Sequence, residues 1–370
     1  MNDRFAEGDL FYFWKGRVGL FALLKAAGLV PGDEVVVPGF TCIVVPNAVL
    51  YARGVPVYAD IDPRTFNVTV ETIEPLLSAR TRAVIVQSTF GLSADLDPIM
   101  ALAERRGLLV IEDCAHALGG EYRGRPNGTI AHAAFFSSQW SKPVSTGLGG
   151  IVFSRRADLS RELARRVESM AVPGFLEQVS LTAQLICRPL ADSRLLHYPL
   201  VETYRWLTQV SGLVSVGSAS HEELVSVRIP SAFEKRMSAM QRRRWHRGLQ
   251  DLPDVIHRRR ATAARYDEYL AGTSIQAPAR PDYATHAMLR YAIRVPDRES
   301  VERRARERRV PLGDWFRSPL HPNTGDLNPW HYRWGQCPVA ERVCTEIVNL
   351  YTDRRLSDRQ LQTLLGAYET

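Results

Sequence analysis

Short runs of β-branched and aliphatic residues alternate with segments of helical periodicity through the first part of the chain. The predicted strands are 34–37, 55–59, 83–87 and 108–111, and the predicted helices between them are 43–53, 70–77 and 98–106. Continuously apolar strands are typical of a parallel sheet that helices cover on both faces. The alternation therefore predicts an α/β fold, with a mostly parallel sheet in a three-layer α/β/α large domain.

The pattern changes after a predicted strand at 149–153 and a helix at 158–170. Residues 173–230 contain helical stretches without strands. One stretch places Leu176, Val179, Ala183 and Ile186 on a face, and another places Leu207, Val210 and Val214 on a face. This helical insert is interpreted as a lid, a dimer contact or a membrane-surface face, and the sequence does not separate the three.

A small α+β domain is predicted at the C-terminal end. A long helix over 236–270, broken near Pro253, leads into it. Its predicted elements are a strand at 289–295, a helix at 300–309, a loop at 315–334, and helices at 339–348 and 357–368. The predicted domains are therefore 1–240, which includes the insert at about 173–230, and 241–370, which includes the linking helix.

Composition excludes several classes of protein. The net charge is +7, but the arginine clusters 242–244 and 258–260 alternate with apolar residues at helical spacing, which favours solvated helix faces over a nucleic-acid patch. No run approaches 18 apolar residues and MNDRFAEGDL has no apolar signal core, so we expect a cytoplasmic protein without a transmembrane segment. Peripheral membrane contact stays open. Five widely spaced cysteines without CxxC pairs predict reduced thiols and no metal site.

An acid and an amine stand out between residues 108 and 150. The apolar run LLVI stops at Glu112 and Asp113, so Asp113 lies at the carboxyl end of a strand, where open α/β sheets bind ligands. Lys142 follows in SSQWSKPVSTGLGG and is one of only four lysines in the chain. A carboxylate that holds a pyridinium nitrogen and an amine that forms a Schiff base are the groups that a pyridoxal phosphate enzyme needs. The competing interpretations are a helix cap for Asp113 and a surface lysine for Lys142.

The segment GRVGLFALLKAAG at 16–28 predicts a helix with glycine at both ends. Free backbone amides and the helix dipole make its start a natural anion site, to which Arg17 adds charge. A plain core helix explains the segment equally well. No nucleotide-binding glycine fingerprint follows the first strand, which disfavours a dinucleotide fold.

Several motifs, in this order, resemble the DegT/DnrJ/EryC1/StrS family of sugar aminotransferases, which are fold type I pyridoxal phosphate enzymes. They are PGDEVVVPGFTCIVVPNAVLYARGVPVYADIDPRTFNV, TRAVIVQSTFGLSADLDPI, LLVIEDCAHALGGEYRGRPNG, FFSSQWSKPVSTGLGGIVF, RMSAMQ and CPVAERVCTEIVNLYTDRRLS. The resemblance covers most of the chain.

The resemblance implies a role for each matching residue. Lys142 is the Schiff-base lysine that also moves the proton in transamination, and Asp113 keeps the pyridine nitrogen protonated. His116 lies near the phenolic oxygen of the ring. Ser137 and the amides of Gly16 and Arg17 hold the phosphate.

The chain also departs from the family pattern. Lys15, Gly16 and Arg17 replace Ser-Gly-Thr, so a guanidinium takes the place of a hydroxyl. Cys42 stands where an aromatic residue stacks on the cofactor, which leaves stacking to another residue such as Phe40. Ser88 replaces a histidine, Leu148 a glutamate, and Glu234 lies at or next to the place of an asparagine that the partner subunit lends to the phosphate.

The resemblance implies a homodimer that transfers an amino group from glutamate or glutamine to a keto sugar, which we expect to be nucleotide-linked, in amino-sugar, polysaccharide or natural-product biosynthesis. Arg236, Arg317 and His321 are candidate substrate-binding residues. One alternative is a pyridoxal phosphate-dependent deoxysugar dehydratase, although those relatives carry histidine in place of the lysine. The other is a cofactor-binding regulatory protein without turnover.

Overall fold

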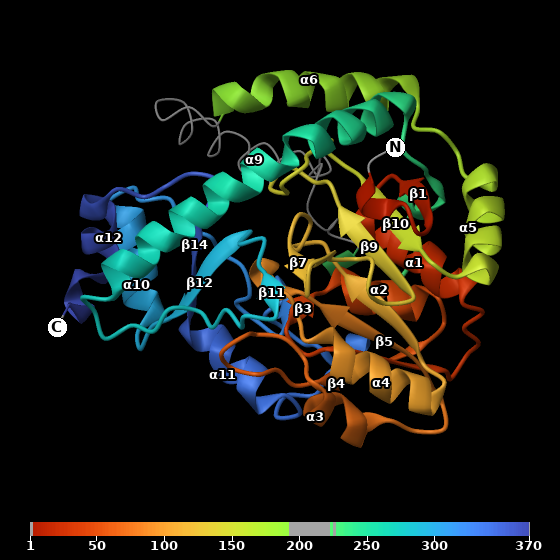
Figure 1. Cartoon of the computed structure of the whole chain (residues 1–370), viewed down its shortest axis with the longest axis horizontal. Helices are drawn as coiled ribbons and strands as arrows, with labels where there is room; N and C mark the ends of the chain where they lie inside the picture. The colour runs from red at the N-terminus through yellow and green to blue at the C-terminus, as the bar shows by residue number, and fades with distance from the viewer. Residues whose placement is uncertain (1–2, 192–222, 225–226, 370) are drawn as a thin grey trace.

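The computed structural model (Figure 1) describes residues 3–191, 223–224 and 227–369. Its centre is a seven-stranded sheet in the order β1-β10-β9-β6-β5-β2-β4. The strands are β1 (Asp9–Phe13), β2 (Glu34–Pro38), β4 (Val55–Ala59), β5 (Thr81–Gln87), β6 (Leu109–Asp113), β9 (Ala133–Ser137) and β10 (Gly150–Ser154). The strands from β4 to β9 are parallel, and β10 is antiparallel to β9 and β1. The predicted mostly parallel α/β fold is confirmed.

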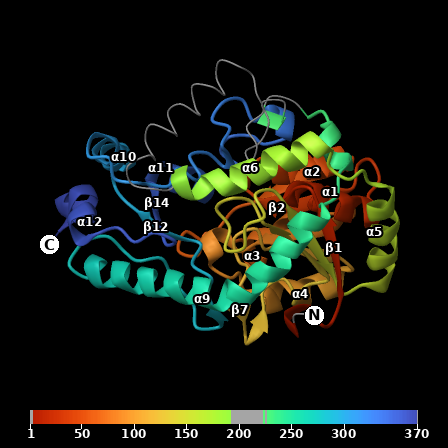
Figure 2. The same cartoon turned by 90° about the horizontal axis from the view of Figure 1, so that it is seen from above.

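Helices lie on both sides of this sheet. They are α1 (Gly16–Ala26), α2 (Val44–Tyr51), α3 (Val70–Ile73), α4 (Leu96–Arg106) and α5 (Ala157–Ser169). Helix α1 packs against α2 and α5, whereas α4 packs against α3 and β6. Figure 2 shows α1 and α2 on one side of the sheet and α4 on the other. The crossover helices follow the predicted order, but β1 and β9 were not predicted as strands.

Helix α9 (Ala239–Leu270) runs from the large sheet to the C-terminal part without the break expected at Pro253 (Figure 1). A proline inside a helix costs about 3 kcal/mol. Two features offset this cost: Ser238 caps the helix start in a capping box with Gln241, and the buried face continues on both sides of the proline, from Trp245 to Leu270. Packing along the whole helix therefore outweighs the local cost.

The C-terminal part pairs β12 (Arg290–Arg294) antiparallel with β14 (Ile347–Tyr351). Its helices are α10 (Arg298–Glu307), α11 (Pro338–Glu346) and α12 (Asp358–Leu365). The small α+β unit is as predicted, except that the helix expected to reach residue 348 ends at Glu346 and gives way to β14. The boundary between the two domains stays a prediction.

Short strands join distant parts of the chain. β13 (Leu320–His321) pairs in parallel with β3 (Thr41–Cys42). β11 (Ala284–Thr285) pairs with β7 (Glu121–Tyr122), which also pairs with β8 (Arg125–Pro126). These pairings bring the C-terminal part against the carboxyl ends of the parallel strands.

One helix of the predicted insert is described, α6 (Phe175–Ala191). Leu181 is buried beside Trp14 and Leu148, whereas Phe175 and Leu176 are 78% and 79% exposed. The second predicted face, with Leu207, Val210 and Val214, lies outside the described residues. None of the helices in the described part is long and apolar enough to cross a membrane. The choice among lid, dimer contact and membrane face stays open.

Glu112 fixes the end of the central strand. Its buried carboxylate accepts backbone N–H bonds from Gly128 (2.7 Å), Ile130 (2.9 Å) and Ala131 (2.8 Å). Three donors satisfy a charge that burial alone would make costly, so β6 extends through Glu112 to Asp113 rather than ending at Ile111.

We expect Glu112→Gln to lower the free energy of unfolding by about 2–4 kcal/mol, because an amide cannot accept all three N–H bonds and turns its own donors toward them. Chemical denaturation would measure the loss. Glu104→Gln on the exposed face of α4 is the matched control. Equal stability of the two variants would contradict this role for Glu112.

Candidate active site

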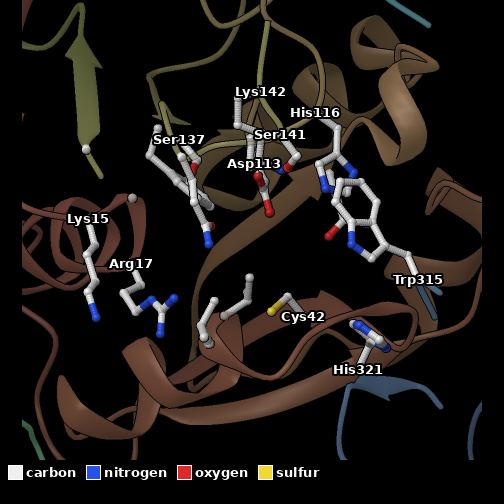
Figure 3. Close-up of a pocket in the computed structure, with 18 of the residues that line it drawn as sticks. Lys15, Arg17, Cys42, Asp113, His116, Ser137, Ser141, Lys142, Trp315 and His321 are labelled. Carbon is white, nitrogen blue, oxygen red and sulfur yellow. Dashed lines mark hydrogen bonds between the residues drawn. The ribbon is translucent and has the colours of Figure 1, made fainter. Parts of the chain in front are cut away.

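A cavity of about 250 Å³ lies at the carboxyl ends of β6 and β9, and the first residues of α1 line it at one end. Figure 3 shows Asp113 and Lys142 near its middle, Lys15 and Arg17 at one end, and Trp315 beside His116 at the other. Its wall includes Lys15, Gly16, Arg17, Cys42, Gln87, Asp113, His116, Ser137, Gln139, Ser141, Lys142, Trp315, Phe316 and His321. The first half of the chain and the loop after α10 therefore build one cavity.

Asp113 is the last residue of β6 and its carboxylate faces the cavity (Figure 3). Burial raises its pKa to about 6, which an N–H bond from Ala115 (2.9 Å) and the charge of Lys142 partly oppose. A protonated ring nitrogen facing this carboxylate would be stabilised by it, because a buried carboxylate needs a cation.

Lys142 lies in the loop between β9 and β10, where its N–H donates to the carbonyl oxygen of Gln139 (3.0 Å). Burial, opposed by the charge of Asp113 and reinforced by that of Arg290, lowers the pKa of its amine to about 7. A large share of Lys142 is thus neutral near pH 7. The neutral amine is the form that attacks a carbonyl carbon or accepts a proton.

The start of α1 can accept an anion. The N–H groups of Val18 and Gly19 both donate to the carbonyl of Lys15, whereas those of Gly16 and Arg17 donate to no acceptor within the described residues. A Cβ added at Gly16 would lie 3.2 Å from Cβ of Ser137, so glycine keeps this end of the cavity open. Two free amides and a nearby hydroxyl match a phosphate group.

The guanidinium of Arg17 has a different partner from the one expected. It donates to both carboxylate oxygens of Glu223, at 2.8 and 2.7 Å, and both side chains are buried. Its charge is therefore largely balanced within the protein. Lys15 also lines this end of the cavity, and burial together with the charge of Arg17 lowers the pKa of its amine to about 8. Sequence reasoning did not select Lys15.

His116 carries an aromatic stack at the opposite end. The indole of Trp315 lies over its ring with centroids 4.7 Å apart and an interplanar angle of 8°. The N–H of Phe90 donates to Nδ1 of His116 at 3.2 Å, and burial holds the pKa of the imidazole well below its usual value. Phe40, suggested as a stacking residue, is fully buried against Phe316 and does not line the cavity. Trp315 was not predicted, because its contact with His116 joins residues that are far apart in the sequence.

Eight of the eleven predicted site residues line the cavity: Gly16, Arg17, Cys42, Asp113, His116, Ser137, Lys142 and His321. Their individual roles remain predictions. Burial raises the pKa of the Cys42 thiol, which keeps it protonated.

Three predicted residues lie elsewhere. Ser88 is buried, its hydroxyl accepts from the N–H of Ala94, and its neighbour Gln87 faces the cavity instead. Arg317 extends to Glu302 at 2.8 Å. The backbone of Arg236 forms an antiparallel bridge with that of Phe13, the last residue of β1. The geometry gives no support to contacts of these three with a ligand in this cavity.

The cavity fits pyridoxal phosphate. A buried carboxylate, a partly neutral amine and an open glycine-lined anion site are the three groups that the ring nitrogen, the aldehyde and the phosphate of this cofactor require.

The sequence model of the DegT/DnrJ/EryC1/StrS aminotransferase family matches residues 14–187 and 200–368. Over 159 residues the chain is 45% identical to an L-glutamine:2-deoxy-scyllo-inosose aminotransferase from Streptomyces fradiae, a match that covers 43% of this chain and 37% of that protein. That match therefore spans well under half of the relative's length.

Two longer matches cover most of the chain. A UDP-N-acetyl-3-dehydro-alpha-D-glucosamine 3-aminotransferase from Acidithiobacillus ferrooxidans is 28% identical over 94% of this chain and 79% of its own. The crystal structure of an aminotransferase from Streptoalloteichus hindustanus has a TM-score of 0.73 at 25% identity, covering 98% of this chain and 86% of that one.

The lowered pKa of Lys142 can be tested in cofactor-free protein. We expect modification of Lys142 by an amine-directed reagent, followed by mass spectrometry, to rise with pH through a midpoint near 7. Asp113→Asn should move this midpoint to lower pH, because it removes the negative charge that favours the ammonium form. A midpoint near that of a free lysine, or a shift to higher pH in the variant, would contradict the electrostatics described above.

Proposed function

The chain belongs to the DegT/DnrJ/EryC1/StrS aminotransferase family, and on this premise we propose that it transfers an amino group from glutamine or glutamate to a keto sugar. Pyridoxal 5'-phosphate is the cofactor of this family and of this protein. The observation that carries the proposal is the presence of Asp113 and Lys142 in one cavity.

The residues of the cavity divide the work of such a reaction. Bound pyridoxal phosphate supplies an electron sink that acidifies the α-carbon of an amino acid. Lys142 would hold the cofactor through its aldehyde carbon, and Nζ of Lys142, once free, would accept the proton from the α-carbon of the amino acid. Asp113 holds the proton on the ring nitrogen. Trp315 and His116 cover the Lys142 side and limit the access of water.

The substrate that we propose is a nucleotide-linked keto sugar, used in amino-sugar, polysaccharide or natural-product biosynthesis. The relative from Acidithiobacillus ferrooxidans is named for a UDP-linked sugar, which supports the nucleotide link. The relative from Streptomyces fradiae is named for L-glutamine, which supports glutamine as the donor. It is also named for 2-deoxy-scyllo-inosose, a ring ketone without a nucleotide, so an acceptor of this kind is a second candidate. We also propose that the protein is a homodimer and lies in the cytoplasm.

Lys142 disfavours the dehydratase alternative, because the resemblance places a histidine there in deoxysugar dehydratases. The regulatory alternative needs a cavity that binds the cofactor but does not turn over. The two are separated from an aminotransferase by the experiments below.

We expect the purified protein with pyridoxal phosphate to be yellow, and borohydride to fix the cofactor onto Lys142, as mass spectrometry of the peptide would show. Lys142→Arg should lose the fixed adduct, because a guanidinium cannot act as the amine nucleophile. The same label on Lys15, Lys25 or Lys235 instead would contradict the assignment.

We expect L-glutamine or L-glutamate to convert the yellow form to the pyridoxamine form, and a keto sugar then to restore the colour. A panel of nucleotide-linked keto sugars and inososes, analysed for a keto-to-amine mass change, would name the acceptor. If none of the common amino donors converts the yellow form, the result would favour the regulatory protein instead.

A further inference from the structure

A series of stacked cationic and aromatic side chains leads from the strands β12 and β14 to the cavity. The guanidinium of Arg290, the first residue of β12, lies 4.2 Å from the ring centre of Tyr351 on β14 and 4.8 Å from that of Trp315. Trp315 stacks in turn on His116, and Nζ of Lys142 lies 4.8 Å from the centre of the same indole. Arg290 and Lys142 therefore flank one aromatic ring at the wall of the cavity.

Arg290 is buried without a strong partner. Its side chain is 5% exposed, and its Nε has no hydrogen-bond acceptor among the described residues. The contacts of Nη1 are long, 3.5 Å to the carbonyl oxygen of Leu289 and 3.6 Å to the carboxylate of Asp353. A guanidinium has five N–H donors, and leaving them unused in a buried site is costly.

The nearest carboxylate is shared. Asp353 is about one third exposed and also lies 3.9 Å from Arg259, so two buried arginines face one acid. Arg259 has hydrogen bonds of its own, to the carbonyl oxygen of Leu289 (3.0 Å) and the hydroxyl of Thr352 (2.9 Å). Nε of Arg259 also lacks an acceptor among the described residues, but Arg290 has no contact as short as these two bonds and is the less well matched of the pair. Its field reaches the reacting groups, because it lowers the pKa of both Lys142 and His116.

The loop that separates Arg290 from the cavity is held by its backbone. Asn349 accepts from the N–H of Trp315 at 3.4 Å and donates to its carbonyl oxygen at 2.9 Å. Phe316, the next residue, has φ of +55°, in the left-handed region that costs a bulky residue energy. These contacts hold the main chain of the loop, so a displacement of the indole from the guanidinium would be a rotation of the Trp315 side chain.

We propose that Arg290 binds the carboxylate of the amino donor, and that the indole of Trp315 is the cover which the donor displaces. A planar guanidinium is the best protein partner of a carboxylate, through two parallel N–H bonds. Arg290 and Lys142 both lie against the indole of Trp315. An α-amino acid whose carboxylate is bound by Arg290 would therefore direct its nitrogen toward Lys142. This inference rests on the proposed aminotransferase function and identifies the part of the cavity that recognises its donor.

The test uses protein loaded with pyridoxal phosphate and follows its absorbance as donor is added. Arg290→Met should raise the donor concentration for half-maximal conversion by about 10- to 100-fold, the value of a charged hydrogen-bonded pair. Arg290→Lys keeps the charge but not the two parallel bonds, and should give an intermediate loss. Arg354→Met removes the guanidinium 4.8 Å from the ring of Tyr351 and should leave conversion unchanged, as a matched control.

The donor itself supplies a second comparison. Wild-type protein should prefer L-glutamate to 4-aminobutyrate, which lacks the α-carboxylate, and Arg290→Met should lose most of that preference. The keto-sugar half-reaction of the pyridoxamine form should be unaffected in this variant. Unchanged donor dependence and unchanged preference in a folded Arg290→Met protein would overturn the proposal.

Failure of the proposed function is separable from failure of this inference. If wild-type protein fixes the cofactor but no amino donor converts it, calorimetric titration with glutarate tests whether Arg290 binds a carboxylate. Binding that Arg290→Met loses and Arg354→Met keeps supports the carboxylate site without turnover. Equal binding by wild type and Arg290→Met, or no binding by the wild type, overturns it.

Discussion

Burial of two opposite charges in one cavity is the constraint on which the site depends. Desolvation raises the pKa of Asp113 and lowers that of Lys142, and the charge of each partly restores the other. Neither group would be useful if it were solvated, because the carboxylate would lose its hold on a ring nitrogen and the amine would stay protonated. The sheet makes this burial possible, since β6 and β9 end at the same edge and the loop with Trp315 covers them.

The elements around this pair fix positions more than they supply chemistry. Glu112 holds the turn at residues 128–131 through three backbone bonds, so the strand that carries Asp113 ends at a defined place. At the other end, the Arg17–Glu223 pair balances the guanidinium charge that was predicted to bind phosphate. The backbone amides at the start of α1 and Lys15 are then the groups that could bind an anion there. The departures from the family pattern thus alter the periphery of the cavity and leave its centre unchanged.

The parts that follow from local sequence were predictable. Strands β2, β4, β5 and β6 are buried on both faces, so they appear as apolar runs, and their order gave the sheet and the place of Asp113. The predicted helix 339–348 ran into the first two residues of β14, Ile347 and Val348, because no glycine or proline separates α11 from the strand. Ser88 was selected from the resemblance to the family, and the structure places Gln87 rather than Ser88 at the cavity, since neighbouring residues at a strand end face opposite ways. The places of Trp315 and Arg290 could not be predicted from local sequence, because they depend on contacts with residues far away in the chain.

The pairing of β3 with β13 has a consequence for how the protein matures. His321 lies beside Cys42 in parallel register, and this short pairing closes one wall of the cavity with a segment that leaves the ribosome long after the central strands. The parallel sheet can assemble during synthesis, since domains fold as units from the N-terminus. The cavity cannot close until the C-terminal loop has emerged. The shifted pKa values of Asp113 and Lys142 therefore depend on a wall segment that is synthesised well after both residues.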